Sequence, residues 1–336
     1  MTAVRPVTLP ETRKSWRVLA TVVVSLLLFA LALYLVDPAR FAWMTNFLLV
    51  FNALLIEATP FILLGALVSA AIEVFMTPRA FERLGALRPS LQLPAAAFAG
   101  MAFPVCECGS VPVARRLAAK GLGAGAAVTF MLAAPVANPV VIASTVVAYR
   151  GRDHFWVMVL GRIFLGVIAA MCAGWVVGRM TRNDLLKPRP DDTLEDDHET
   201  HGEARWKDYF GHVGNDFVFM GRFLILGAAV AAIVQTFVPQ SWIDPVANTP
   251  IVSQVAMMAL AYILSLCSES DAFVAASFVQ FGPSSQLAFL VFGPMVDTKL
   301  TALYMGTYNR GFFRTILIVV GTVTLVGTLW IGVFFG

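Results

Sequence analysis

Long apolar runs dominate this chain and limit what it can fold into. Examples are residues 18–36, 154–180, 217–238 and 312–335, each with few or no charged residues. A helix of about 20 apolar residues is long enough to cross the hydrocarbon core of a bilayer. The chain is 58% hydrophobic and 13% charged, whereas a soluble domain carries about 25% charged residues. The sequence therefore predicts an all-α polytopic membrane protein.

The N-terminal apolar run is predicted to be a retained helix and not a cleaved signal peptide. Basic residues precede it, it is too long for a signal core, and no small-x-small cleavage site follows it. We expect residues 1–16 to form a cytoplasmic tail and residues 17–40 an extra N-terminal transmembrane helix. The four cysteines, Cys106, Cys108, Cys172 and Cys267, lie in apolar segments, which argues against a secreted disulfide framework.

Helix breakers divide other apolar segments into pieces too short to cross a membrane. The pieces that flank Val105–Pro112 are predicted to form a re-entrant helical hairpin with its tip at those residues. Residues 250–281 repeat this pattern around Cys267–Asp271. A backbone break in lipid is tolerated only where it is buried in protein or lines a cavity. We therefore expect the function at these tips.

Three longer apolar stretches also contain helix breakers. Residues 41–75 are predicted to be interrupted at Glu57–Pro60. A span over residues 124–149 is expected to break at Pro135–Pro139, and one over residues 287–308 at Gly293–Asp297. These stretches predict bent or discontinuous helices.

The two halves of the chain resemble each other. Residues 61–75 and 223–237 are identical at seven of fifteen aligned positions, and a cysteine-bearing tip and a broken helix follow each of them in the same order. We interpret residues 41–180 and 211–336 as repeats joined by a polar linker, residues 181–210. Each repeat is predicted to hold about three transmembrane helices and one hairpin, and an odd number of spans makes the second copy inverted.

The distribution of basic residues predicts the orientation. The N-terminal tail and residues 79–88, 115–120 and 179–189 are basic, whereas residues 239–286 contain no lysine or arginine. Basic segments mark the cytoplasmic side, so the N-terminus is predicted to be cytoplasmic. The hairpins would then enter from opposite sides and meet near the midplane, an arrangement typical of secondary transporters.

The first tip carries residues suited to a soft substrate. Cys106 and Cys108 are separated by one residue, and two thiols at this spacing can bind one thiophilic metal or metalloid. Glu107 could move a proton, while Gly109 and a half-helix starting near Pro112 would offer N–H groups. The alternative is that both cysteines are simply small buried side chains.

The second half carries most of the acids. Charged groups at membrane depth are costly and often functional, which favours a role in ion coupling. The alternative is that Asp297 and Lys299 form a purely structural ion pair. Cys267 aligns with Cys106, and Asn138 aligns with Asp297. Substrate contact is therefore predicted at Cys106, Glu107, Cys108, Gly109, Asn138 and Cys267, and ion coupling at Glu269, Asp271, Asp297 and Lys299.

Other polar residues are weaker candidates for the functional site. Arg162 and Arg222 are expected near a membrane face, with their charged ends in the interface. His198 and His201 form a weak metal-ligand pattern, for which a solvated acidic linker is the alternative. No nucleotide-binding or hydrolase motif is found in the sequence, so no enzymatic activity, resident metal or cofactor is predicted.

The tip sequences resemble a known family. P-V-C-E-C-G-S-V-P at residues 104–112, followed by the run from Gly121 to Pro139, is similar to the predicted-permease family formerly called DUF318. Residues 60–75 also look like its early helix, and the resemblance covers most of residues 45–310. That family contains the ArsP-type organoarsenical efflux permeases. The resemblance implies a permease of the bacterial inner membrane, and leaves its substrate open.

The sequence thus predicts a secondary, proton-coupled exporter of a small, thiophilic solute such as a trivalent organoarsenical. Its partners would be that small-molecule or metalloid substrate and the lipid bilayer, with no nucleic acid and with a homo-oligomer left open. Three alternatives remain: a carrier of another solute with structural cysteines, a membrane thiol oxidoreductase that uses Cys106 and Cys108, and an assembly subunit.

Overall fold

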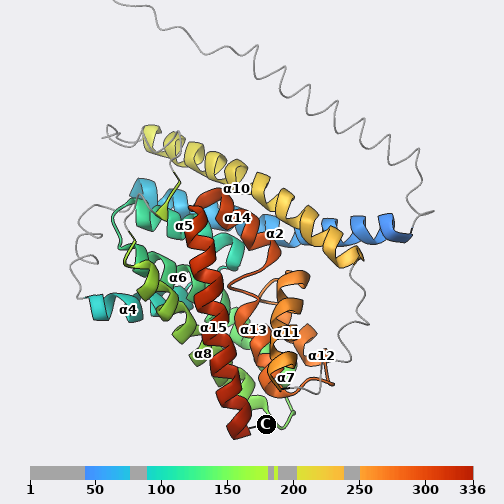
Figure 1. Cartoon of the computed structure of the whole chain (residues 1–336). Helices are drawn as coiled ribbons and strands as arrows, with labels where there is room; N and C mark the ends of the chain where they lie inside the picture. The colour runs from blue at the N-terminus through green and yellow to red at the C-terminus, as the bar shows by residue number, and fades with distance from the viewer. Residues whose placement is uncertain (1–41, 76–88, 181–184, 188–202, 238–249, 336) are drawn as a thin grey trace, which may run out of the picture. The chain divides into compact units, whose positions relative to one another are not determined.

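A computed structural model describes residues 42–75, 89–180, 185–187, 203–237 and 250–335 (Figure 1). The predicted N-terminal tail, the extra first helix and most of the linker, with His198 and His201, lie outside these ranges. The chain divides into two units, residues 1–49 and 50–336. Only the first turns of one helix are described in the smaller unit, so the architecture below is that of the larger one.

The first half consists of one long helix, two short helices, a broken helix and an unbroken one. In chain order they are α2 (Ala42–Phe75), α4 (Pro89–Ala102), α5 (Glu107–Ala119), α6 (Ala124–Ala137), α7 (Pro139–Tyr149) and α8 (Phe155–Val177).

The second half has the same order of elements. They are α10 (Glu203–Phe237), α11 (Pro250–Leu264), α12 (Asp271–Ser277), α13 (Pro283–Phe292), α14 (Thr298–Thr307) and α15 (Arg310–Phe335).

Five stretches of the described residues are long and apolar enough to cross a membrane. They are residues 43–75, 124–149, 155–177, 205–237 and 311–334. Within the described ranges all regular structure is helical, apart from one isolated bridge between Leu186 and Tyr308. The prediction of an all-α polytopic membrane protein is confirmed, while the inverted repeat stays a prediction.

Packing between helices follows the same plan in each half. Helix α4 packs on α6 and α6 on α8, just as α11 packs on α13 and α13 on α15. Between the halves, α5 packs on α14 and α12 packs on α7, while α8 lies against α15. Each hairpin therefore contacts the second piece of the other half's broken helix, which is the exchange expected from an inverted repeat.

The helices break and begin at other positions than the prolines of the sequence predict. Helix α2 runs through Pro60 without the predicted interruption at Glu57–Pro60, and α6 includes Pro135, so its break from α7 is confined to Asn138. Helix α5 begins at Glu107 and not near Pro112. A proline removes a single helical hydrogen bond and often only bends the helix.

Helix α10 also begins earlier than expected, because its first residues belong to the segment predicted as a polar linker. It starts at Glu203. Trp206 packs edge-on against Phe75 and Tyr209, and Tyr209 packs at a tilt against Phe75. These ring contacts give the polar-looking segment an apolar face on which to fold.

Candidate functional site

The two hairpin tips contact each other through Glu107. One carboxylate oxygen accepts a hydrogen bond from the Ser268 hydroxyl at 3.1 Å. The other lies 3.4 Å from the Lys299 Nζ, with which it forms an ion pair. Glu107 is the first residue of α5, Ser268 lies between α11 and α12, and Lys299 is in the first turn of α14. All three side chains are almost fully buried.

Thiols and carboxylates gather around this contact. The ligand atoms of Glu107, Cys267 and Glu269 lie within 4.8 Å of one another. The Cys267 Sγ is 4.0 Å from the Lys299 Nζ. Among the described residues, the donors that converge therefore come from both tips, and not from the Cys106 and Cys108 pair alone.

The remaining cysteines differ in their surroundings. Cys106 and Cys108 are buried beside this group, whereas Cys172 is half-buried on α8. Cys106 precedes the first turn of α5 and Cys108 lies within it, next to unpaired N–H groups of the helix end. The positive end of the helix dipole favours a bound anion here.

Asn138 and Asp297 both begin the second piece of a broken helix. The Asn138 carbonyl oxygen accepts from the Val141 N–H at 3.0 Å, and Asp297 Oδ1 accepts from the Leu300 N–H at 2.6 Å. Asn138 also donates to the Val105 and Ala134 carbonyls. These bonds tie the broken helix of the first half to its own tip, so the side chain predicted to contact substrate has a structural role as well.

Arg162 binds Asp271 in a fully buried ion pair. The two Nη atoms lie 2.8 and 2.7 Å from the two carboxylate oxygens, and Arg162 is 1% exposed. Its other N–H groups donate to the Thr145 hydroxyl and to the Val136 and Ser268 carbonyls. The expectation that Arg162 reaches a membrane face is wrong, because partners on α7, α12 and the second tip satisfy it inside the protein. Arg222 is exposed and lies over the Phe219 and Phe223 rings, as that expectation requires.

Carboxylates outnumber basic groups in this region. We define the central cluster as the five acids Glu57, Glu107, Glu269, Asp271 and Asp297, the two bases Arg162 and Lys299, and the thiols of Cys106, Cys108 and Cys267. Glu57 joins from α2 through the Ser270 hydroxyl at 3.4 Å. Uncompensated charge in a buried site is costly. Glu107, Asp271 and Asp297 are buried with only two buried bases, whereas Glu57 and Glu269 are partly exposed. The buried part of the cluster therefore favours a bound proton or a bound cation.

Asp297 has the least compensated oxygen. Its Oδ2 is buried, accepts no hydrogen bond from the described residues, and lies 3.9 Å from the Lys299 Nζ. The predicted structural pair with Lys299 is thus long, and Glu107 is the nearer partner of that lysine. The carboxylate predicted to couple ions has one oxygen that caps a helix and one that is unsatisfied.

A second ionic group lies at the far end of α5. Arg116 contacts Glu73 at 3.0 Å and Asp216 at 3.4 Å, and Lys120 contacts Glu73 at 2.5 Å. The Ser69 hydroxyl donates to Asp216 at 2.7 Å. These contacts hold α5 between the long helices α2 and α10.

The segment Leu185–Lys187 closes the space between α5 and the α14–α15 turn. The Lys187 N–H donates to the Thr307 carbonyl, and the Asn309 N–H donates to the Leu185 carbonyl. Arg115 on α5 donates to the Lys187 carbonyl at 3.1 Å. Leu185 is fully buried, so this part of the predicted linker is packed against both halves and is not solvated.

The sequence missed Arg162 and Glu57 as members of the cluster, and Ser268 as a hydrogen-bond partner of Glu107. Arg162 gave a usable signal, since it lies near the middle of an apolar span where a charge must find a partner inside the protein. Ser268 and Glu57 gave none, because their positions depend on how the second tip packs against α2 and α5.

Comparisons with known proteins agree with this picture. The family model ArsP_1, described as "Predicted permease", matches residues 43–333. The UPF0718 protein YcgR of Bacillus subtilis is 37% identical over 286 residues, which cover 83% of this chain and 95% of the relative. A protein of Streptococcus mutans, named as a putative two-component membrane permease complex subunit, is 35% identical over 282 residues, 83% of this chain and 91% of its own. No solved structure matches.

Proposed function

Because the chain belongs to the ArsP_1 family of predicted permeases, we propose that it carries a small solute across the bacterial inner membrane by secondary transport. The chain is a multi-pass membrane permease: its family is described as predicted permeases, and the Streptococcus mutans relative is named as a permease complex subunit. The proposal concerns the solute, the coupling ion and the direction.

The observation that supports this proposal is the central cluster itself. It combines three buried thiols with more carboxylates than basic groups, at the contact between two interrupted helical hairpins. A soft cation or metalloid is bound best by thiolates, and binding releases the thiol protons. Neighbouring carboxylates can accept those protons, which suits exchange of protons for a thiophilic solute such as a trivalent organoarsenical.

The transport step would be a movement of one half against the other around this cluster. Substrate sites between repeats, formed by discontinuous helices, are typical of secondary transporters. At the tips the halves are joined by polar contacts, such as the Glu107–Ser268 and Arg162–Asp271 pairs, while apolar packing joins them elsewhere. Such polar contacts can separate and re-form as the halves move.

The test is transport into everted membrane vesicles, across a panel of arsenicals and soft metal ions. Wild type is compared with Cys267→Ser and with the double variant Cys106→Ser, Cys108→Ser, and Cys172→Ser is the matched control. We expect the first two variants to lose transport and the control to retain it. Unchanged transport in all variants would remove the soft-ligand mechanism and favour a carrier of another solute with structural cysteines.

A second subunit is a further part of the proposal, and the Streptococcus mutans relative supports it through its name as a complex subunit. Reconstitution of the purified chain alone in liposomes tests this idea. Transport by the chain alone would contradict an obligatory partner. A redox titration of Cys106 and Cys108 tests the thiol oxidoreductase alternative, which requires a reversible disulfide between them.

A further inference from the structure

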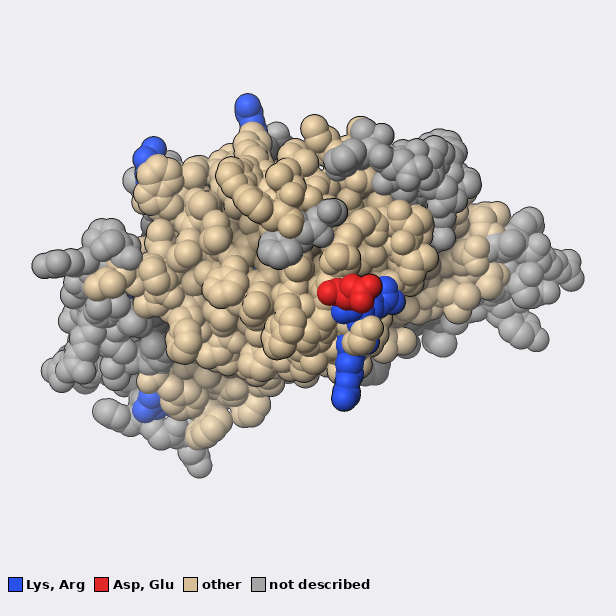
Figure 2. Space-filling view, turned by 90° about the horizontal axis from the view of Figure 1, so that it is seen from below, with Lys and Arg blue, Asp and Glu red and all other residues tan. Residues whose placement is uncertain are grey.

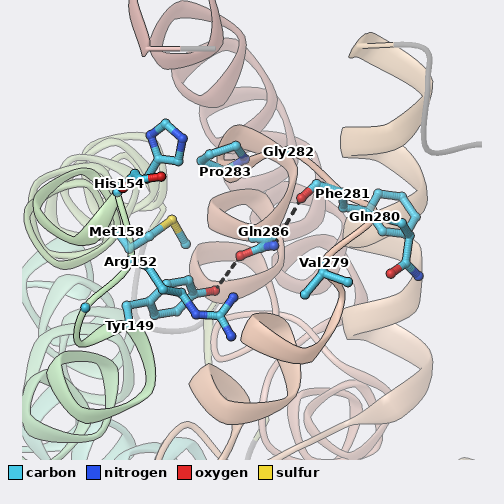
Figure 3. A pocket seen from close by; sticks show the side chains of 12 residues that line it. Tyr149, Arg152, His154, Met158, Val279, Gln280, Phe281, Gly282, Pro283 and Gln286 are labelled. Atoms are coloured by element: carbon cyan, nitrogen blue, oxygen red, sulfur yellow. Dashed lines mark hydrogen bonds between the residues drawn. The ribbon is translucent and has the colours of Figure 1, made fainter.

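A polar pocket of about 510 Å³ lies where the α7–α8 turn meets the α12–α13 connection (Figure 3). Its rim includes Arg152, Asp153 and His154 on one side and Val279 and Gln280 on the other. These rim residues are exposed, or nearly so. The face of the molecule at this end carries few charged side chains, and at one place acidic and basic side chains lie next to each other (Figure 2).

The floor of the pocket is closed by a hydrogen bond between the halves. The Tyr149 hydroxyl donates to the Gln286 side-chain oxygen at 2.9 Å (Figure 3). The Gln286 amide donates to the Phe278 and Phe281 carbonyls, both at 3.0 Å. Tyr149, Gln286 and Met158 are all buried, so their side chains form a closed floor beneath the pocket.

The Arg162–Asp271 ion pair lies one helical turn beyond the floor. Thr145 precedes Tyr149 by four residues on α7, and Arg162 follows Met158 by four residues on α8. Residues four apart share one face of a helix. Arg162 on α8 connects α7 and α12, since it contacts Thr145 at 3.0 Å and Asp271 at 2.7 Å.

Contacts continue from the ion pair into the central cluster. Arg162 donates to the Ser268 carbonyl at 3.3 Å, and the Ser268 hydroxyl donates to Glu107 at 3.1 Å. One helical turn therefore separates the pocket floor from the ion pair, and hydrogen bonds link the ion pair to the acids at the tips.

We propose that this pocket is the vestibule through which the solute enters or leaves the central cluster, and that the Arg162–Asp271 pair is its gate. The proposal rests on the proposed function. Both closing contacts join a helix of the first half to the second half: Tyr149 to Gln286, and Arg162 to Asp271. A movement of one half against the other breaks both at once. Arg162 acts here as a positioning residue, because it holds the second tip in place.

The native cysteines report on this gate. In a Cys172→Ser background the remaining thiols are those of the central cluster, each at most 1% exposed. A membrane-impermeant methanethiosulfonate is applied to intact cells and to everted vesicles, and labelling is read as an increase in protein mass. A Val279→Cys reporter on the exposed rim identifies the membrane face to which the vestibule opens.

Two variants open the path by different means. Asp271→Asn removes the charge from the ion pair, and Tyr149→Ala removes the floor contact. In each, we expect the central cysteines to be labelled roughly tenfold faster or more, from the face that labels Val279→Cys and not from the other. Asp153→Asn makes the same chemical change at the rim, and is expected to leave the central cysteines protected.

Protection that persists in both opened variants would overturn the proposal, as would labelling from the opposite face or from both faces. The reagent needs no solute, so the outcome is separate from the proposed function. Gated labelling without transport of any tested solute would refute the permease mechanism and keep the path. Transport without gated labelling would keep the mechanism and refute this path.

Discussion

Individual side chains of the central cluster serve both halves of the molecule. The sequence predicts substrate contact chiefly at the first tip, together with Cys267, and ion coupling chiefly at the second. In the structure Glu107 of the first tip is bonded to Ser268 and paired with Lys299, and Cys267 of the second tip shares a ligand group with Glu107. Binding a soft cation at that group would compete with Lys299 for the same carboxylate, so substrate and proton exchange become linked at Glu107.

The shared ligand group predicts a soft-cation affinity that depends on Cys267. Thiolates hold soft ions such as Cd²⁺ better than carboxylates do, so Cys267→Ser should weaken Cd²⁺ binding by roughly tenfold or more. Equilibrium dialysis of the purified protein against Cd²⁺ measures the effect. Cys172→Ser is the matched control, and an equal loss of affinity in that variant would count against the site.

Asp297 predicts a separation of stability from coupling. Asparagine caps helices about as well as aspartate, whereas loss of a cap costs about 0.5–2 kcal/mol. We therefore expect Asp297→Asn to melt near the wild-type temperature but to lose transport driven by a pH gradient. Asp297→Ala should melt at a lower temperature and should also lose this transport. Thermal melting in detergent and flux in vesicles measure the two effects. If a pH gradient still drives transport in Asp297→Asn, the coupling proton is carried by another acid.

At the scale of elements, the two long helices clamp the Glu107–Lys299 contact through glycines. A Cβ added at Gly65 on α2 would lie 2.5 Å from the Gly109 carbonyl oxygen on α5. A Cβ at Gly227 on α10 would lie 2.9 Å from the Lys299 Cα on α14. Backbones that approach this closely move together, so α2 carries the first tip and α10 carries the start of α14.

This close approach predicts that Gly65→Ala is destabilising. Overpacking costs about 1–3 kcal/mol, whereas alanine in an open helix position stabilises by roughly 0.5–1 kcal/mol. Gly214→Ala on α10, which has nothing within 4 Å of its added Cβ, is the control. Thermal melting in detergent should show opposite shifts for the two variants, and shifts of the same sign would contradict tight packing at Gly65.

Helix elements could be predicted from the sequence where polarity and length decided them, but not where proline was the only clue. The short pieces around Cys267 and the break at Gly293–Asp297 follow from apolar length and polar tips, and the structure has both. Pro60 and Pro135 were read as breaks, yet helices continue through them. At Pro60, packing in a long helix outweighs one lost hydrogen bond, and sequence alone does not reveal that balance.

At the scale of the whole molecule, two different closures join the halves. Side chains make one, through Tyr149 and Gln286 beneath the open pocket. Backbone groups make the other, where Leu185–Lys187 bonds to α5 and to the α14–α15 turn. A pattern search that treats the segment between the halves as a solvated linker misses this second closure.

The predicted orientation is tested by cysteine labelling in the background without Cys172. Lys120→Cys, at the end of α5, should react from the cytoplasmic face, and Pro283→Cys, at the start of α13, from the opposite face. Pro283 lines the pocket, whereas Lys120 lies in the ionic group with Glu73. A periplasmic position 120 or a cytoplasmic position 283 would reject the inverted arrangement.

Most residues of the candidate site could be predicted from the sequence, but not which of them contact each other. Charged and thiol residues at membrane depth are rare enough to be noticed one by one, and most of the central cluster was found in this way. Their pairing could not be found, because Arg162 and Asp271 are 109 residues apart and meet only after both halves have packed.

That separation in sequence has a consequence for how the protein is made. Chains grow at about 5–20 residues per second, so Arg162 waits on the order of 5–20 s for Asp271 to emerge. A lone arginine at the centre of an inserted helix costs about 2.5–3.5 kcal/mol. Until then only Val136 and Thr145, both made earlier, can accept from it. We therefore expect a chain truncated after α8 to be degraded faster in the membrane than the full chain, because its Arg162 lacks the Asp271 partner.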